Sequence, residues 1–383
     1  MIDLLLKNGV LSDNDQPVNL AIDQGVIIGQ SPCLNYDARQ AIDLHGCLII
    51  PGFVESHLHL DIALMNNAER PGRPVSFVHP AELNRAMEER RLAFTEEDIC
   101  QRASHALDMA LRHGVTALRA QCQVDYTVGL KHLKALLEVR RQYAERLTLQ
   151  IVVFPQQGLL YQPETLALVR ESFRLGADVM GCASNLDPAV KTTQDMRRHI
   201  DTALALAMEM DVDLDLHADL GLPEQVSLDN LETVYAARRA IESGYQQRAT
   251  AGHVCALDAA EPEVAEKAIE LMHQAQINVV SQPDMYRLGR ADRRNVRRGL
   301  TRVKELLAAG INVTYASNNV RDAFRPLGNF DLLEEGLILA YGAHMDTVNE
   351  LETLLQMSTT NAARALRLEG YGLSQGCFAD LVV

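Results

Sequence analysis

Strand-like and helix-like segments alternate along residues 48–316, and this alternation restricts the fold more strongly than any other feature of the chain. Each expected strand is a short apolar run, and the expected helices carry apolar residues at helical spacing. The expected strands are Leu48–Glu55, Val115–Ala120, Leu147–Phe154, Ala177–Cys182, Val212–Leu216, Ala249–His253, Ile277–Ser281 and Ile311–Ala316. The expected helices include 81–113, 129–145, 163–175, 193–210, 229–243, 262–276 and 299–309. Eight β/α repeats predict a TIM-like (β/α)8 barrel.

A doubly wound open sheet is the alternative fold for such an alternation. It is less well supported, because no GxGxxG motif follows the first strand and nothing else indicates dinucleotide binding. Residues 1–47 show short strands separated by turns, and the last residues show a turn followed by one more strand. We therefore expect a small β-sandwich domain from both chain ends, 1–47 plus 366–383, beside a barrel over 48–365.

The overall composition limits the partners that this chain can bind. Its 383 residues carry a formal net charge of −15, which disfavours nonspecific contact with nucleic acid or an anionic membrane. No apolar run is long enough to span a bilayer, and the N-terminus lacks a signal segment, so a cytoplasmic protein is expected. The seven cysteines are scattered without a CxxC pair, which indicates reduced thiols.

One basic stretch, Arg287–Arg302, departs from this acidic character. It is compatible with a phosphate- or RNA-binding patch. It is also compatible with a loop and helix start whose arginines pair with carboxylates of this acidic chain or of a neighbouring subunit. The second interpretation is favoured, because no aromatic residues alternate with the arginines to form a stacking platform.

Four histidines fall at the carboxyl ends of expected strands, where barrels hold their active sites. His57 and His59 end the first strand, and residues two apart in a strand point to the same side. His217 ends the fifth strand and His253 ends the sixth. Three imidazoles can bind Zn²⁺ or Fe²⁺ and leave positions open for water, while a fourth can carry protons. The pattern indicates a hydrolase with one divalent metal ion.

These residues also carry a family resemblance. The segment 51–61, which contains both first-strand histidines, resembles the first-strand motif of the amidohydrolase superfamily and of its cytosine deaminase branch. The segments 150–158 and 298–313 are similar to the same branch, and 316–322 is closer to a triazine-processing relative, N-isopropylammelide isopropylaminohydrolase.

The resemblance implies a set of residue roles. His57, His59 and His217 would bind the metal, and His253 would handle protons. Gln156 would bind the heterocyclic ring, and the resemblance also implies a homo-oligomer. Beside these roles, we predict Asn319 as a further substrate-binding residue.

Two positions depart from the family pattern. Asn318 stands where the family has a metal-binding aspartate, and a neutral amide cannot accept a proton at neutral pH. Leu220 stands where cytosine deaminase has a glutamate, although the triazine relative also lacks that glutamate. A nearby carboxylate, Asp219, Asp61 or Asp322, could replace the lost aspartate. His253 could also act alone, or the chain could be catalytically impaired.

The expected activity is hydrolytic removal of an amino or alkylamino group from a small pyrimidine- or triazine-like heterocycle. The expected catalytic residues are His253, Asn318 and Asp219. Two alternatives remain open at this point. One is hydrolysis of a cyclic amide, and the other is a non-catalytic protein that binds a small ligand and has a weakened metal site.

Overall fold

The computed structural model describes every residue except 13, 66–79, 222, 224 and 284–299. Residues 287–299 of the predicted basic stretch Arg287–Arg302 therefore lie outside the described residues. Among the described residues, no helix is both long and apolar enough to cross a membrane. All seven cysteines are free thiols, as expected.

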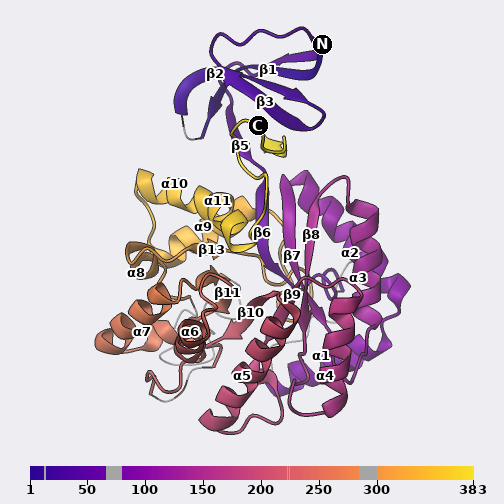
Figure 1. The fold of residues 1–383 in the computed structure, drawn as a ribbon, viewed down its shortest axis with the longest axis vertical. Coiled ribbons are helices and arrows are strands. Elements are labelled where there is room, and N and C mark those ends of the chain that lie inside the picture. Colours follow the sequence, from indigo (N-terminus) through magenta and orange to yellow (C-terminus); the bar gives the residue numbers. More distant parts are fainter. Residues whose placement is uncertain (13, 66–79, 222, 224, 284–299) are drawn as a thin grey trace.

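The centre of the molecule is an eight-stranded parallel sheet that curves into a barrel (Figure 1). Its strands lie side by side in chain order, from β6 to β13, so each strand pairs with its neighbour in the sequence. They are β6 (Phe53–Leu58), β7 (Val115–Gln123), β8 (Thr148–Phe154), β9 (Val179–Cys182), β10 (Asp213–Ala218), β11 (Ala249–His253), β12 (Asn278–Ser281) and β13 (Val313–Tyr315). The predicted (β/α)8 fold is confirmed.

The barrel closes between its first and last strands just beyond β13. The backbone N–H of Asn318 donates to the carbonyl of His57 at 3.0 Å, and the N–H of His59 donates to the carbonyl of Asn318 at 2.8 Å. Closure thus places Asn318 directly beside the HxH pair, although more than 250 residues separate them in the sequence.

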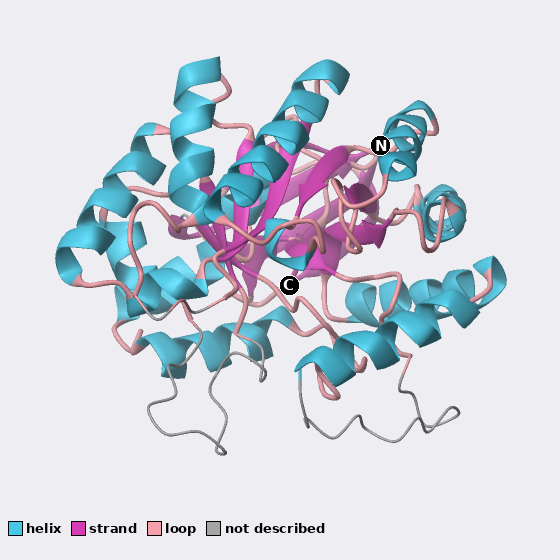
Figure 2. Cartoon of the chain, turned by 90° about the horizontal axis from the view of Figure 1, so that it is seen from below, coloured by secondary structure: helices cyan, strands magenta, loops and turns pink. Residues whose placement is uncertain are grey.

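Helices surround the barrel, with the apolar faces of the strands and helices packed into one main core (Figure 2). They are α1 (Pro80–Ala93), α2 (Glu96–Arg112), α3 (Lys131–Tyr143), α4 (Pro163–Arg174), α5 (Thr193–Met210), α6 (Glu232–Ser243), α7 (Pro262–Gln274), α8 (Val303–Ala308), α9 (Leu332–Ala343), α10 (Val348–Met357) and α11 (Thr360–Ala365). The helix expected over 81–113 is two helices, because Thr95 leaves helical geometry and its side chain caps α2 by accepting from the N–H of Asp98.

A second, smaller sheet lies apart from the barrel and has its own apolar core. It consists of β1 (Ile2–Leu11), β2 (Asn14–Asp23), β3 (Val26–Ser31), β4 (Ala38–Asp43), β5 (Leu48–Pro51) and β14 (Leu381–Val382). Both chain ends contribute to it, since β14 pairs antiparallel with β5.

The strand expected over Leu48–Glu55 is divided between the two sheets at Gly52. Its first half is β5, which pairs with β1 and β14, and its second half begins β6 of the barrel. A side chain at Gly52 would collide with Thr116, and both backbone groups of Gly52 are hydrogen-bonded, to Asp380 and Tyr371. The small sheet therefore extends to residue 51, four residues beyond the expected boundary.

Candidate metal and catalytic centre

Three of the four predicted histidines converge at the carboxyl ends of β6 and β10. His57 and His59 emerge from β6, and His217 emerges from β10. The Nε2 atoms of His59 and His217 lie 3.1 Å apart. Two imidazole nitrogens that share one metal ion at 2.0–2.1 Å are separated by about 3–3.4 Å. The spacing of these two rings therefore fits a shared ion.

His57 lies beside these two rings. Its ring lies 4.6 Å from that of His217, and its buried Nε2 has no hydrogen-bond partner among the described residues. Burial lowers the pKa of His57 well below its usual value and lowers the pKa of His59 to about 4. Both rings are thus neutral at physiological pH, which is the form that coordinates a metal. The residues present fit a divalent cation.

His253 lies beside these three histidines, at the end of β11. Its ring centroid is 5.1 Å from that of His217 and 5.7 Å from that of His57. His57, His217 and His253 each offer a nitrogen within 4.8 Å of the others, so His253 is also close enough to be a ligand. Its backbone adopts φ 73°, a left-handed conformation that β-carbon crowding disfavours. Tertiary contacts hold this histidine at the centre against its local preference.

A buried polar cluster orients the ring of His57. The Oδ1 atom of Asp215 lies 3.6 Å from His57 Nδ1 and accepts a hydrogen bond from Gln121 Nε2 at 3.0 Å. The Gln121 amide is also 3.2 Å from His57 Nδ1. Arg119 pairs with the other oxygen of Asp215 at 3.2 Å, and both of these residues are fully buried. The cluster holds Nδ1 of His57 toward the carboxylate, and Nε2 then points to the centre.

An aromatic ring orients His217. Phe154, the last residue of β8, stacks on the His217 ring with the centroids 4.3 Å apart and an interplanar angle of 25°. Phe154 also makes an edge contact with His59. This packing restricts the rotation of both imidazoles around the proposed metal position.

Asn318 is buried and holds a left-handed conformation with φ 60°. Asparagine and aspartate both tolerate this conformation, so the backbone does not explain why the amide replaces the acid. The structure places Asn318 beside the histidines, as expected, and supplies no charge there. The sequence analysis named three acids that could supply the missing charge: Asp61, Asp219 and Asp322.

Asp61 is one of these acids, and it is already engaged. Its Oδ2 accepts hydrogen bonds from His132 Nδ1 at 2.7 Å and from the N–H of Gln123 at 3.1 Å. Burial alone would raise the pKa of Asp61, but the hydrogen bond from His132 and the positive charges of His132 and Arg91 hold that pKa below its usual range. Asp61 is a structural anion between β6 and α3.

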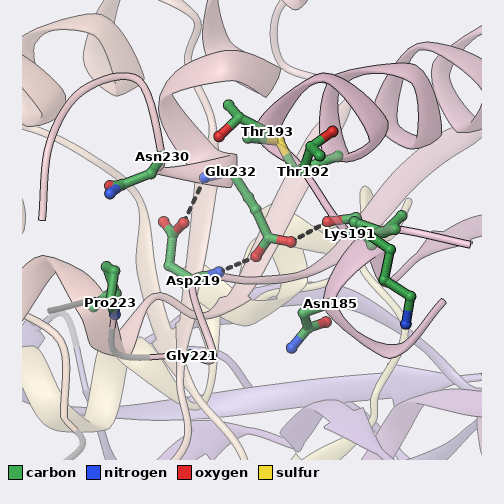
Figure 3. Close-up of a pocket in the computed structure, with 13 residues that line it drawn as sticks. Asn185, Lys191, Thr192, Thr193, Asp219, Gly221, Pro223, Asn230 and Glu232 are labelled. Carbon is green, nitrogen blue, oxygen red and sulfur yellow. Dashed lines mark hydrogen bonds between the residues drawn. The ribbon is translucent and has the colours of Figure 1, made fainter. Parts of the chain in front are cut away.

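Asp219, predicted as catalytic, contacts the start of α6 instead (Figure 3). Its carboxylate accepts hydrogen bonds from the N–H of Glu232 at 2.6 Å and from the hydroxyl of Thr233. In return, the Glu232 carboxylate accepts from the N–H of Asp219 at 2.5 Å and from the Ser184 hydroxyl. These contacts satisfy the free N–H groups at the start of a helix, which is a structural role. They weigh against Asp219 as a base.

The Asp219–Glu232 pair also lines a cavity of about 360 Å³ at the carboxyl ends of β9 and β10, together with Asn185 and Lys191 (Figure 3). Burial raises the pKa of Asp219 to about 6 and that of Glu232 to about 7. Each carboxylate accepts a hydrogen bond from the backbone N–H of the other residue. These two hydrogen bonds join the end of β10 to the start of α6 and so stabilise the wall of this cavity.

Asp322 is the third acid, and it holds the loop after β13. Its two oxygens accept hydrogen bonds from the N–H groups of Phe324 and Arg325 and from the Asn319 side chain at 2.6 Å. Asn319, predicted to bind substrate, thus donates its amide to Asp322. All three candidate carboxylates already have structural partners, so none of these three is free to supply the charge that the family pattern has at position 318.

Buried amides line the same end of the barrel. Gln156 follows β8, and its Oε1 has no hydrogen-bond partner among the described residues. Gln282 follows β12, and the same holds for both polar atoms of its amide. A side chain at Gly252 would meet both Gln282 and His57, so the Gln282 amide lies close to His57. Unsatisfied buried amides are costly unless a ligand pairs with them.

Sequence reasoning named no role for Asp215, Arg119, Phe154 or Gln282. A strand-face argument could have found the first, because Asp215 lies two residues before His217 on the same face of β10. Gln282 immediately follows the seventh expected strand, a position that could have been searched in the same way. No local signal marks Arg119 or Phe154, since their partners come from other strands.

Comparison with known proteins gives concordant matches over nearly the whole chain. The profile of the Amidohydrolase family matches residues 80–383. N-isopropylammelide isopropyl amidohydrolase of Pseudomonas sp. (strain ADP) is 30% identical, over 100% of this chain and 90% of that protein. Pterin deaminase of Rhizobium rhizogenes is 26% identical, over 98% of this chain and 84% of the relative.

A solved structure agrees with these sequence matches. The crystal structure of 5-methylcytosine deaminase from Klebsiella pneumoniae, liganded with 5-fluorocytosine, superposes with a TM-score of 0.88 at 31% identity. The match covers 99% of this chain and 90% of that one. The similarity therefore includes both the barrel and the smaller sheet.

Proposed function

Because this chain belongs to the amidohydrolase family and is a hydrolase of C–N bonds, we propose that it removes an amino or alkylamino group from a small, neutral nitrogen heterocycle. The observation that carries this proposal is the convergence of the buried imidazoles of His57, His59 and His217 beside buried amides whose polar atoms lack partners among the described residues. Relatives named for ammelide, pterin and methylcytosine chemistry support the substrate class.

His57, His59 and His217 would hold one divalent cation, zinc or iron. The cation supplies a Lewis acid that makes water a stronger nucleophile at neutral pH. The carboxylate of Asp215, 3.6 Å from His57 Nδ1, would favour the tautomer that keeps the proton on Nδ1 and presents Nε2 to the ion.

The amides would recognise the ring. Gln156 offers a buried acceptor and Gln282 offers both a donor and an acceptor, which suits a heterocycle whose edge alternates N–H, C=O and ring nitrogen. A site with unpaired amides discriminates strongly against analogues that lack the matching polar groups. Such a lining favours a neutral substrate over a charged one.

His253 would move the protons of the reaction. Water adds its oxygen to the ring carbon that bears the exocyclic nitrogen, and one water proton passes to His253. His253 returns that proton to the departing nitrogen as the carbon–nitrogen bond breaks. The products are the oxo or hydroxy heterocycle and ammonia or an alkylamine. In this scheme Asn318 contributes an amide oxygen and no proton transfer.

The test combines metal analysis with a product screen. The purified chain is expected to contain about one zinc or iron ion by elemental analysis and to release ammonia or alkylamine from aminopyrimidines, aminotriazines or aminopterins. His217→Ala should lose both the metal and the activity. Asn318→Asp should bind the metal more tightly, because a carboxylate adds a charged ligand.

Other results would redirect the proposal. Uptake of water with ring opening and no free amine would indicate a cyclic-amide hydrolase. A chain that stays free of metal unless it carries Asn318→Asp, with heterocycles bound but unchanged, would indicate a ligand-binding member of the family.

A further inference from the structure

Arg91, in the last turn of α1, is only 1% exposed, yet its guanidinium has no counterion in the described part of the chain. Its Nε and Nη1 atoms are buried and have no hydrogen-bond partner there. The other three buried arginines each pair with a carboxylate: Arg102 with Asp98, Arg119 with Asp215 and Arg325 with Glu335. A buried charge without a partner is costly, so the fold must gain something by keeping it.

The packing of α1 places Arg91 at the carboxyl ends of the barrel strands. Met87, one turn before Arg91, shares an apolar cluster with Ile62, which follows β6, and Ala323, which follows β13. Lys131 at the start of α3 donates to the carbonyl of Arg91 at 3.1 Å and so fixes the end of the helix. Figure 1 shows α1 at the end of the barrel that faces away from the small sheet. This is the end where the histidines converge.

The charge of Arg91 acts on residues of this site. Burial is the main cause that lowers the pKa of His59, and the positive charge of Arg91 lowers it further. Burial raises the pKa of Asp322 to about 6, and the same charge opposes that rise. Because the electrostatic effect of a charge weakens with distance, Arg91 lies near both the first and the last strand of the barrel.

The nearby carboxylates form their hydrogen bonds with other donors. Asp61 accepts from His132 and from a backbone N–H group. Asp322 accepts from the Asn319 side chain and from two backbone N–H groups. The Nε and Nη1 donors of Arg91 therefore remain available to a ligand.

A hydrogen bond joins α1 to the loop that carries Gln156. Gln157 Nε2 donates to Glu88 Oε2 at 2.6 Å, and Glu88 lies three residues before Arg91. Residues three apart lie on the same side of a helix. The side of α1 that bears Arg91 thus faces the loop of Gln156, whose buried Oε1 also lacks a partner among the described residues. Gln156 offers an acceptor to a ligand, and Arg91 offers donors.

We propose that Arg91 binds the substrate by donating hydrogen bonds to a ring oxo oxygen, so that the preferred heterocycles carry an oxo group in addition to the amino group that is removed. This inference rests on the proposed function, because it specifies the substrate class of the same site. An oxo oxygen has two lone pairs and a partial negative charge, which suits a guanidinium, and the ring stays neutral. A ring with amino groups alone would leave the charge of Arg91 poorly paired.

Binding of product-like rings tests this without relying on catalysis. Uracil and cyanuric acid carry oxo groups and no amino group, so they can bind without releasing an amine. Calorimetric titration of the full chain, supplied with Zn²⁺, should show that Arg91→Met weakens their binding by roughly 10–100-fold, as expected for a hydrogen bond to a charged group. Arg91→Lys should keep part of the affinity, because a charged donor remains.

A stability measurement separates ligand binding from a structural role. Since Arg91 has no described partner to lose, Arg91→Met should unfold in urea near the wild-type midpoint. Arg102→Met is the matched control, because Arg102 is also buried but pairs with Asp98 and donates to two backbone carbonyl groups. It should lower the urea midpoint clearly and leave the affinity of the folded protein for uracil unchanged.

Equal affinity of wild type and Arg91→Met for both rings, or no binding to either protein, would overturn the proposal. A urea midpoint of Arg91→Met as low as that of Arg102→Met, with ring binding intact, would instead make Arg91 a counterion of Asp61 and Asp322. Ring binding that depends on Arg91 without amine release from any heterocycle would refute the proposed function alone. Amine release from oxo heterocycles that is insensitive to Arg91→Met would refute this inference alone.

Discussion

Replacing Asp215 by asparagine tests whether the buried cluster behind His57 serves the metal or only the fold. The substitution keeps the shape of the side chain but removes the charge that lies 3.6 Å from His57 Nδ1. Changes in groups that orient a ligand histidine typically cost 10–100-fold in metal affinity, or about 1.4–2.7 kcal/mol. We expect a loss in this range for Zn²⁺, measured on the purified chain by competition with a chromogenic chelator.

The same substitution also affects stability, so a second variant is needed. Arg119 loses its buried counterion, and breaking such a pair costs roughly 3–5 kcal/mol. We expect the lower end, because Arg119 keeps its hydrogen bonds to Gln150, Thr250 and the Ala365 carbonyl. Urea unfolding of the metal-free protein measures this cost.

Gln150→Leu is the matched control. It removes two contacts of Arg119, at 3.1 Å each, and leaves Asp215 and His57 in place. It should reduce stability by about 1–3 kcal/mol while zinc affinity stays within about twofold of wild type. Our reasoning is refuted if Asp215→Asn binds zinc as tightly as wild type, or if Gln150→Leu weakens zinc binding to the same extent.

Three further predictions concern the fold. Gly52→Ala should leave little folded protein in expression and thermal unfolding assays, because its Cβ would collide with Thr116 where the chain passes between sheets. Gly29→Ala, whose Cβ would meet only Leu34 at an ordinary contact distance of 3.6 Å, should cost far less. Thr95→Ala should lower the free energy of unfolding by about 1 kcal/mol through loss of the α2 cap, and Thr95→Ser should restore most of it. Burial lowers the pKa of His199 to about 4, so the unfolded chain binds a proton there between pH 6.5 and 4 while the folded chain does not. The stability that His199 contributes is therefore fully present above pH 6.5 and declines as the pH falls. In urea titrations, His199→Gln should lose less stability than wild type between pH 7 and pH 5. Equal losses in the two proteins would contradict the lowered pKa of His199.

Whether a feature could be predicted from the sequence depends on how far apart in the chain its interacting residues lie. All eight barrel strands could be predicted, because a buried strand of a parallel sheet is a continuous apolar run that is visible within a few residues. The histidines could be predicted for the same reason, since each directly ends such a run. The two halves of Leu48–Glu55 could not be separated, because both are apolar and only their partners, in different sheets, distinguish them.

The acids show the opposite case. From the sequence, Asp61, Asp219 and Asp322 are equivalent, since each follows a strand end that also bears a site residue. The tertiary structure distinguishes them by their partners, which are His132, the start of α6 and the loop after β13. Side-chain hydrogen bonds between distant segments leave no periodic pattern in the chain, so no local analysis could have found them.

The sequence by itself determined the barrel and the set of histidines at the ends of its strands. These follow from residue type and from the period of apolar residues, which are local properties. Only the tertiary structure decided that the Nε2 atoms of His59 and His217 meet at 3.1 Å and that Asp215 and Arg119 lie behind His57. Such distances depend on the register between strands and on the closure of the barrel, to which the whole chain contributes at once.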